Sequence, residues 1–157
     1  MVTQPFGAWR PDITGRNSGA ASVASGVLPG ANGYRPWPGL ASTSDAVAAA
    51  VRGAVTARST ADVVSIFAGT AVKLYKFVDP TTAWTNVTRS SAVDYTVATD
   101  NYWQFGVFGD NLIAVQSGDA PQFIGITAGT NFEPLGGSPP TAKYICIIGQ
   151  HVMLGSL

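Results

Sequence analysis

The sequence predicts a mainly β protein: an incomplete β-propeller with a repeat of about 40 residues, preceded by an extended arm and one short helix. Three observations lead to this prediction. Short β-branched and aromatic runs, separated by glycine turns, fill the chain from residue 53 onward. Three of these turns carry glycines spaced 40 residues apart, at Gly69, Gly109 and Gly149. Charged residues make up only 11% of the 157 residues, against about 25% in a typical domain, which disfavours helical bundles and coiled coils.

The first 44 residues have no sustained hydrophobic period, and we expect them to form an extended arm. Prolines and glycines recur throughout this segment and interrupt helices and strands alike. Large aromatic residues are interspersed among them, and such side chains on an extended chain usually dock onto a surface. The docking surface is either the body of the same chain or a neighbouring subunit. The candidate anchors of the arm are Phe6, Trp9, Arg10, Asp12, Tyr34 and Trp37.

One short helix or helical turn is expected after the arm. Ser42-Thr43-Ser44-Asp45 is a cluster of N-cap residues, and it precedes AVAAAV, a run of good helix formers. The following residues, 51–59, alternate loosely and suit a first β-strand equally well.

The rest of the predicted body, residues 45–157, consists of β-hairpins. Ala68-Gly69-Thr70 is expected to form the turn of the first hairpin, and Gly149-Gln150-His151 the turn of the last. The predicted strands are 63–67 with 72–78, 103–108 with 112–116 and the neighbouring 122–127, and 144–148 with 152–154.

The hairpins share one pattern: an apolar strand, a glycine, two polar or small residues, and another apolar strand. A repeat of about 40–45 residues with about four short strands is the spacing of a propeller blade. Such a small sheet cannot bury both of its faces alone, so it packs on the next blade. Propellers need about four to eight blades, whereas this chain provides about two and the start of a third. We therefore expect either a piece of a longer product or a ring that partners complete, with a plain β-sandwich as the alternative fold.

No catalytic, cofactor-binding or metal site is predicted, and the chain is not expected to be an enzyme. The single histidine, His151, lies in a turn, and the single cysteine, Cys146, lies in an apolar strand, where a buried inert thiol is expected. Asp110, Asn111 and Asp119 suit turns and do not match a calcium loop. No glycine motif for phosphate binding is present.

The charge balance excludes further classes of protein. Nine basic residues balance nine acidic ones, which argues against a basic face that binds nucleic acid. No apolar run approaches the roughly 20 residues of a membrane-spanning helix. Either something other than charge repulsion keeps so uncharged a surface soluble, or partners cover part of it.

Several stretches of the sequence carry a family resemblance. The arm contains PFGAWRPD and VLPGANGYRPWPGL, and the body contains IFAGTAVKLYKF, WQFGVFGDNLIAV, DAPQF and LGGSPPTAKYICIIGQHVMLG. These stretches resemble the tail nozzle, or tail tubular, proteins of short-tailed bacteriophages and prophages. The resemblance covers nearly the whole chain.

The resemblance implies a structural virion protein with a β-propeller body. Proteins of that family form a six-fold ring at the distal end of the tail, where they continue the DNA channel and hold it closed until infection. The expected partners are other copies in a hexameric ring, the tail adaptor and fibre proteins, and phage DNA that passes without specific binding. The expected location is the virion, after assembly in the host cytoplasm.

Two other functions compete with this interpretation. A carbohydrate- or receptor-binding propeller would present aromatic platforms in its loops, and the candidates are Trp84, Tyr102 and Trp103. Packing inside or between blades explains these three residues equally well. A propeller hydrolase would need an acid/base constellation, and the sequence offers one glutamate and eight dispersed aspartates.

Overall fold

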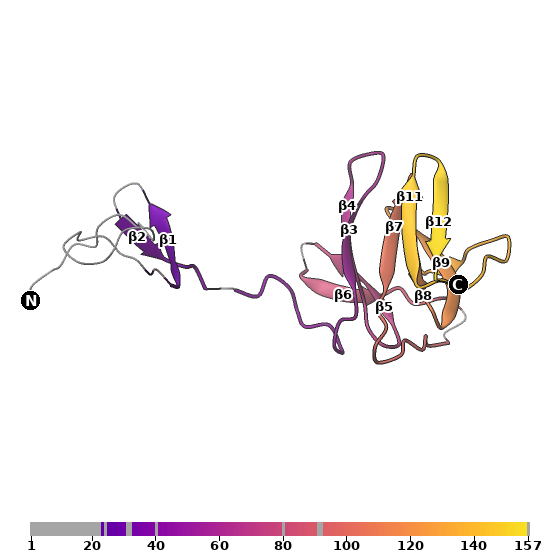
Figure 1. Cartoon of the computed structure of the whole chain (residues 1–157), viewed down its shortest axis with the longest axis horizontal. Helices are drawn as coiled ribbons and strands as arrows, with labels where there is room; N and C mark the ends of the chain where they lie inside the picture. Colours follow the sequence, from indigo (N-terminus) through magenta and orange to yellow (C-terminus); the bar gives the residue numbers. More distant parts are fainter. Residues whose placement is uncertain are drawn as a thin grey trace, which may run out of the picture. The chain divides into compact units, whose positions relative to one another are not determined.

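The computed structural model describes residues 23, 25–30, 33–39, 41–79, 81–90 and 93–156. The chain divides into two compact units, Met1–Ser42 and Thr43–Leu157. All secondary structure in the described residues is β-strand, without a helix, so the mainly β prediction is confirmed (Figure 1).

The described residues of the first unit include a β-hairpin. Strand β1 (Val27–Gly30) pairs antiparallel with β2 (Gly33–Pro36). The hairpin is closed by the Trp37 amide, which donates to the Gly26 carbonyl at 2.9 Å. Both strands are edge strands, which is where a sheet tolerates proline. Part of the predicted extended arm is thus locally folded.

The second unit, called the body below, contains three antiparallel sheets whose strands follow one another in chain order. Their strands are listed here in that order. The first sheet consists of β3 (Ala54–Arg58), β4 (Val64–Gly69), β5 (Leu74–Val78) and β6 (Ala83–Asn86). The second consists of β7 (Gln104–Phe108), β8 (Asn111–Gln116), β9 (Asp119–Gly125) and β10 (Glu133–Pro134). The third is the hairpin of β11 (Tyr144–Ile148) and β12 (His151–Gly155).

The predicted hairpins are present as β4–β5, β7–β8 with β9, and β11–β12. The predicted helix is wrong, because the chain from residue 45 bonds to the first sheet instead of to itself. The Asp45 amide donates to the Thr82 carbonyl at 2.9 Å, and the Asp45 carbonyl accepts from the Trp84 indole at 3.0 Å. Tertiary hydrogen bonds therefore override the helix propensity of the alanine run.

The first and second sheets pack face to face. Phe67 projects from β4 and meets Phe132 edge-on, with ring centroids 6.1 Å apart. Leu112 and Ile124, from β8 and β9, are at most 1% exposed on the facing side. The core between the two sheets consists of Ala57, Phe67, Leu74, Val87, Tyr95, Val97, Trp103, Leu112, Ala114, Ile124, Ile126 and Phe132.

The second sheet is covered on its other face as well. Ile113 and Val115 point away from the first sheet and are 3% and 1% exposed. A Cβ atom built on Gly106 would lie 3.1 Å from side-chain carbons of Ile145 and Ile147, so β11 packs against β7 at this point. Strand β7 lies between β3 and β11, so the first strands of three successive sheets stand side by side (Figure 1).

The glycines at the 40-residue spacing do not have equivalent roles. Gly109 and Gly149 have φ of +59° in the turns between the first and second strands of their sheets. Gly69 instead ends the second strand of the first sheet and pairs with Leu74, and the turn starts at Thr70, whose amide donates to the Lys73 carbonyl at 2.8 Å. The predicted turn Ala68-Gly69-Thr70 is therefore wrong. The 40-residue spacing therefore places equivalent turns in the second and third sheets. In the first sheet the same spacing falls one strand later, at the end of the second strand.

Candidate interaction surfaces

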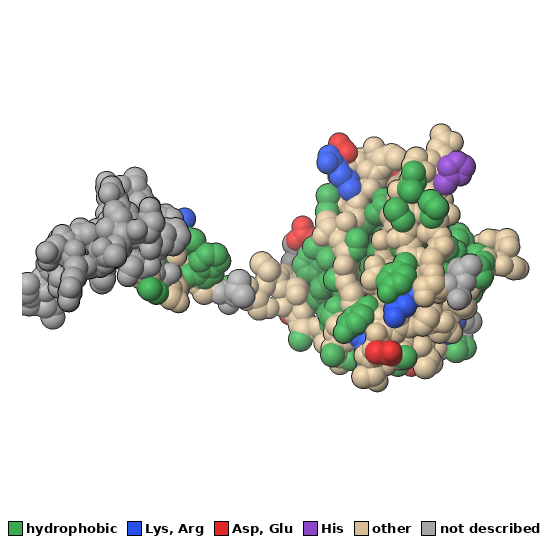
Figure 2. Space-filling model, in the orientation of Figure 1, with side chains coloured by type: hydrophobic (Ala, Val, Ile, Leu, Met, Phe, Trp, Pro, Cys, Tyr) green, Lys and Arg blue, Asp and Glu red, His purple; other side chains and the backbone are tan. Residues whose placement is uncertain are grey.

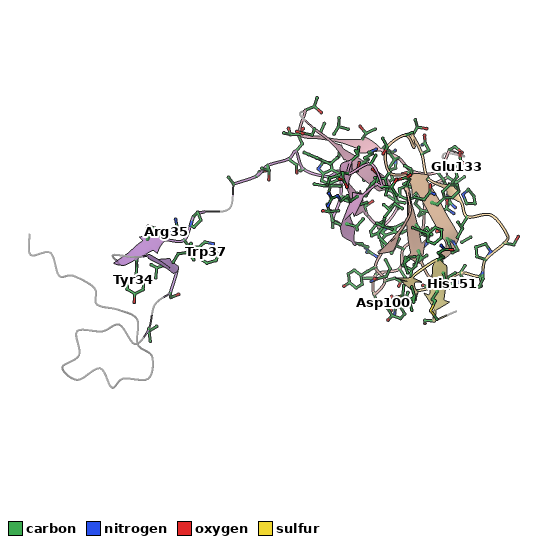
Figure 3. The ribbon with its side chains drawn as sticks, turned by 90° about the horizontal axis from the view of Figure 1, so that it is seen from above. Tyr34, Arg35, Trp37, Asp100, Glu133 and His151 are labelled. Carbon is green, nitrogen blue, oxygen red and sulfur yellow. The ribbon has the colours of Figure 1, made fainter. Side chains whose placement is uncertain are left out.

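The ionisable side chains of the described residues are dispersed over the body. The described residues contain no cluster of three or more His, Cys, Asp or Glu side chains that could hold a metal ion. His151 and Glu133 lie well apart on the body (Figure 3). His151 is exposed and belongs to β12, opposite Ile148, so its predicted place in the turn is wrong. Cys146 is exposed beside Met153, so the predicted burial of the thiol is also wrong.

The body presents two apolar sheet faces at the ends of its stack of sheets. The first, here called the leading face, is the side of the first sheet that points away from the second. Register places Thr56 beside Ile66 and Arg58 beside Val64 on this side. Val64 and Ile66 are 57% and 37% exposed. By register the leading face carries Ala54, Thr56, Arg58, Val64, Ile66, Ala68, Tyr75, Phe77, Trp84 and Asn86. Ala68 and Tyr75 are buried, at 1% and 9% exposure.

Residues just before β3, within the body, cover one part of the leading face. The Trp84 indole, which donates to the Asp45 carbonyl, packs on Phe77 with ring centroids 5.5 Å apart. Both aromatic side chains are half-buried as a result. The part on β3 and β4 stays exposed, with Val64 and Ile66 at its centre.

The second apolar surface, here called the trailing face, is the side of the β11–β12 hairpin that points away from the second sheet. The hairpin alternates, so Ile145 and Ile147 point inward and are half-buried. Their neighbours point outward and are exposed: Tyr144, Cys146, Ile148, His151 and Met153. Figure 2 shows hydrophobic side chains spread over one side of the body with few charged groups among them.

A cavity of about 710 Å³ opens in the first sheet. The pairing of β4 with β5 ends at Phe67 and Lys76, although β4 begins at Val64 and β5 continues to Val78. The two strands diverge beyond that pair. The cavity between them is lined by Val64, Ser65, Ile66, Lys76, Phe77, Val78, Asp79, Thr85, Val87, Gly129 and Thr130.

Lys76 is the only cation that lines this cavity, and it ties the first sheet to the second. Its Nζ donates to the Ile126 carbonyl at 2.7 Å and lies 5.6 Å from the centre of the Phe67 ring. Ser65 Oγ donates to the same carbonyl at 3.2 Å. Burial lowers the pKa of Lys76 because it disfavours the charged ammonium. These contacts explain the lysine as a link between sheets.

A smaller polar pocket, of about 200 Å³, includes Arg89. Its guanidinium forms an ion pair with Asp119 at 3.1 Å and donates to the carbonyls of Val93 at 2.7 Å and Asp94 at 2.8 Å. The same group lies 4.4 Å from the centre of the Tyr95 ring, and burial raises the pKa of Tyr95 to about 12. Arg89 therefore holds three segments together, which is a structural role.

The predicted anchors of the arm are only partly described. Phe6, Trp9, Arg10 and Asp12 lie outside the described residues. Tyr34 and Trp37 belong to the first unit, on β2 and directly after it (Figure 3). Tyr34 is half-buried, whereas Trp37 is 59% exposed.

The candidate carbohydrate platforms differ in exposure. Trp103 is 3% exposed, its indole donates to the Thr70 carbonyl at 2.8 Å, and its ring meets that of Tyr95. Trp103 is therefore a core residue, in agreement with the interpretation that it packs inside the protein and not in a carbohydrate platform. Trp84 packs on Phe77, and Tyr102 is 59% exposed.

Sequence reasoning did not single out the leading and trailing faces. The available signal was the nearly continuous apolar character of the run VVSIF, interrupted by one serine, and of the run ICII. In a strand with one buried face, apolar and polar residues alternate, whereas a strand buried on both faces is apolar throughout. A run without this alternation therefore indicates apolar side chains on both faces of its strand.

Comparison with protein-family models, with curated proteins and with solved structures found no match for this chain. None of the described residues belongs to a helix that would be long and apolar enough to cross a membrane.

Proposed function

We propose that this chain is a structural protein of a bacteriophage particle: a subunit of the nozzle ring that continues and closes the DNA channel of a short tail. In this proposal, its three sheets are blades of a β-propeller. The chain acts by packing against other protein and carries out no chemistry.

The observation that carries the proposal is the stacking of the sheets. The second sheet is buried on both faces, while the stack presents exposed apolar side chains at either end. Exposed apolar faces of this kind mark surfaces that other protein covers. The placement of β7 between β3 and β11 supports a propeller, in which the first strands of successive blades surround one axis.

The assignment to a phage tail is supported by the resemblance of PFGAWRPD, VLPGANGYRPWPGL and the body motifs to nozzle proteins. The balance of nine basic and nine acidic residues is compatible with a DNA conduit, because each contact of a lysine or arginine with phosphate would add affinity and slow passage.

The proposal is tested by locating the chain in assembled particles. An epitope tag is added to the gene that encodes this chain, particles are purified, and gold-labelled antibody is imaged by electron microscopy. We expect label at the distal end of the tail. A matched strain with the tag on a capsid protein should show label on the head alone. Purified particles without label, or with label only on the head, would contradict the proposal.

A carbohydrate- or receptor-binding propeller is the second candidate, and the exposed Tyr102 ring favours it. Binding of the purified chain to host-cell glycans separates the two functions. Under the second function, Tyr102→Ala abolishes glycan binding, because stacking on the ring is lost. Under the first, neither the wild-type chain nor the variant binds.

A further inference from the structure

The cavity between β4 and β5 extends to the inner side of the first sheet, the side that packs on the second sheet. Register places Lys76 beside Phe67 on one neighbouring strand and beside Thr85 on the other. Directly paired residues point to the same side of a sheet, and Phe67 lies in the core between the two sheets. Lys76 and Thr85 therefore point inward. The same holds for three further lining residues, each two positions away along the chain from one of these: Ser65, Val78 and Val87.

The opposite wall of the cavity is the segment between β9 and β10, and hydrogen bonds fix this segment at both of its ends. At one end, the Ile126 carbonyl accepts two side-chain hydrogen bonds from the first sheet. At the other end, the Phe132 amide donates to the Val87 carbonyl at 2.8 Å. Gly129 and Thr130 lie between these two ties and line the cavity. The folded body thus forms the cavity by itself, and sites for small molecules are usually preformed in this way.

Lys76 brings a positive charge into this space without a carboxylate to neutralise it. Its side chain is half-buried, and no carboxylate of the described residues lies within ion-pair distance of it. An ammonium group has three hydrogen-bond donors, of which the Ile126 carbonyl takes one. A charge that is withdrawn from water is stabilised when it is paired and hydrogen-bonded. An anion in the cavity would supply both.

The rest of the lining suits an apolar chain attached to such an anion. The hydrocarbon walls are the side chains of Val64, Ile66, Phe77, Val78 and Val87. Ligand sites typically combine apolar walls with a few polar groups that fix the orientation, and the volume of about 710 Å³ falls within their usual range of about 300–1,000 Å³. A single ammonium balances a single negative charge, which fits a carboxylate better than a phosphate group of nearly two charges.

The cavity opens at the edge of the body between the two sheets. Thr85, which points inward from β6, and Thr130, on the facing segment, are both exposed. Entry along β6 does not cross the leading face. Asp79 is the one acidic residue among the described residues of the lining, and it is exposed beyond the end of β5, so that water screens its charge.

We propose that this cavity binds a small carboxylic acid with an apolar chain. The carboxylate accepts hydrogen bonds from the Lys76 ammonium at the inner end, and the apolar chain lies against the valine and isoleucine side chains. Thr85 and Thr130 flank the entrance. This binding site goes beyond the proposed function, because no part of its argument depends on a phage tail.

Titration of the purified full chain with octanoate, followed by NMR of the backbone amides, tests the site. We expect saturable shifts at Lys76, Thr85 and Gly129. Octanamide has the same chain length and no charge, and it should bind about 10- to 100-fold more weakly, which is the usual value of a hydrogen bond to a charged group. Inorganic phosphate should not displace octanoate.

Two variants test the roles of the charge and of the entrance. Lys76→Met should weaken octanoate by the same factor and leave octanamide unchanged. Lys143→Met is the matched control, because Lys143 is also half-buried, with its ammonium 5.8 Å from the centre of the Tyr144 ring, and it lies outside the cavity. Thr85→Trp should block the entrance and abolish binding while Lys76 is intact, which keeps the test valid if Lys76→Met unfolds. Thr56→Trp, at an exposed threonine outside the cavity, should bind octanoate as the wild type does.

Three results would overturn the inference: no saturable shift with octanoate, shifts centred on a site outside the cavity such as Met153, or equal binding of octanoate and octanamide by the wild type. A segment of the chain that already fills the cavity would give the first of these results. A chain that does not bind octanoate but whose tag still labels the tail end would refute this inference and leave the proposed function standing. Octanoate binding without label at the tail would do the reverse.

Discussion

Gly69→Ala is expected to destabilise the body strongly, although alanine usually suits a β-strand better than glycine. A Cβ atom at this position would lie 2.2 Å from Cδ1 of Trp103 and 2.7 Å from Cγ. Ordinary van der Waals contact begins at 3.4 Å, so the indole would have to retreat by more than an ångström. Trp103 has little space for this movement, because it is 3% exposed and packs against Tyr95 and Phe105.

The magnitude follows from two costs. Overpacking a dense core typically costs about 1–3 kcal/mol. The retreat also lengthens the 2.8 Å hydrogen bond from the Trp103 indole to the Thr70 carbonyl beyond bonding range, and a hydrogen bond contributes about 0.5–1.5 kcal/mol. Together they predict a loss of about 2–4 kcal/mol in the free energy of unfolding.

The assay is urea unfolding followed by circular dichroism, with linear extrapolation to water and all samples at one protein concentration. Gly136→Ala is the control, because no atom lies within 4 Å of the Cβ built there, and we expect a change within about 0.5 kcal/mol. The cost of Gly69→Ala should also shrink when Trp103 is replaced by leucine. A loss below about 0.5 kcal/mol, or an equal loss in the leucine background, would refute the reasoning.

Three further perturbations probe the core and its titrating groups. Phe132→Ala should cost about 3–5 kcal/mol of unfolding free energy, because Phe132 is fully buried against Phe67; a loss below about 1 kcal/mol in urea would contradict this packing. Burial raises the pKa of Tyr95 from 10.0 to about 12, so its contribution to stability is complete below pH 10 and is lost as the pH rises toward 12. The Tyr95→Phe variant should therefore lose less unfolding free energy than the wild type between pH 10 and about pH 12. Identical pH profiles of the two proteins would contradict the raised pKa of Tyr95. Hydrogen bonds from the hydroxyl and the amide of Thr60 lower the pKa of Asp110. Thr60→Ala removes the hydroxyl bond and should raise that pKa in an NMR titration, and an unchanged value would show that the hydroxyl bond is absent in solution.

The strands of the body were predictable because each hairpin carries a local signal. The runs that became β4, β8 and β11 are rich in apolar and β-branched residues, and a turn glycine precedes β8 and follows β11. Gly109 and Gly149 were placed correctly in turns, where their φ of +59° favours glycine.

Features that depend on distant contacts were not predictable. Gly69 is glycine because the ring of Trp103, 34 positions later in the sequence, occupies the space of a side chain. The run after Asp45 has helix propensity, but the backbone of Asp45, at its start, donates to the carbonyl of Thr82 and accepts from the indole of Trp84. Cys146 was expected inside because its strand is apolar, yet the hairpin has only one covered side.

The chain order of the strands has a consequence for folding during synthesis. Every sheet of the body consists of strands that are neighbours in the chain, so each can pair as soon as it leaves the ribosome, without waiting for distant segments. The apolar side of each sheet that faces the next one then stays exposed to solvent until that next sheet has been synthesised. Within the body, the sheet of β3 to β6 is made first, and the next sheet covers only the side that carries Phe67. Val64 and Ile66 lie on its other side, so they are exposed from an early stage of synthesis and are accessible to a chaperone.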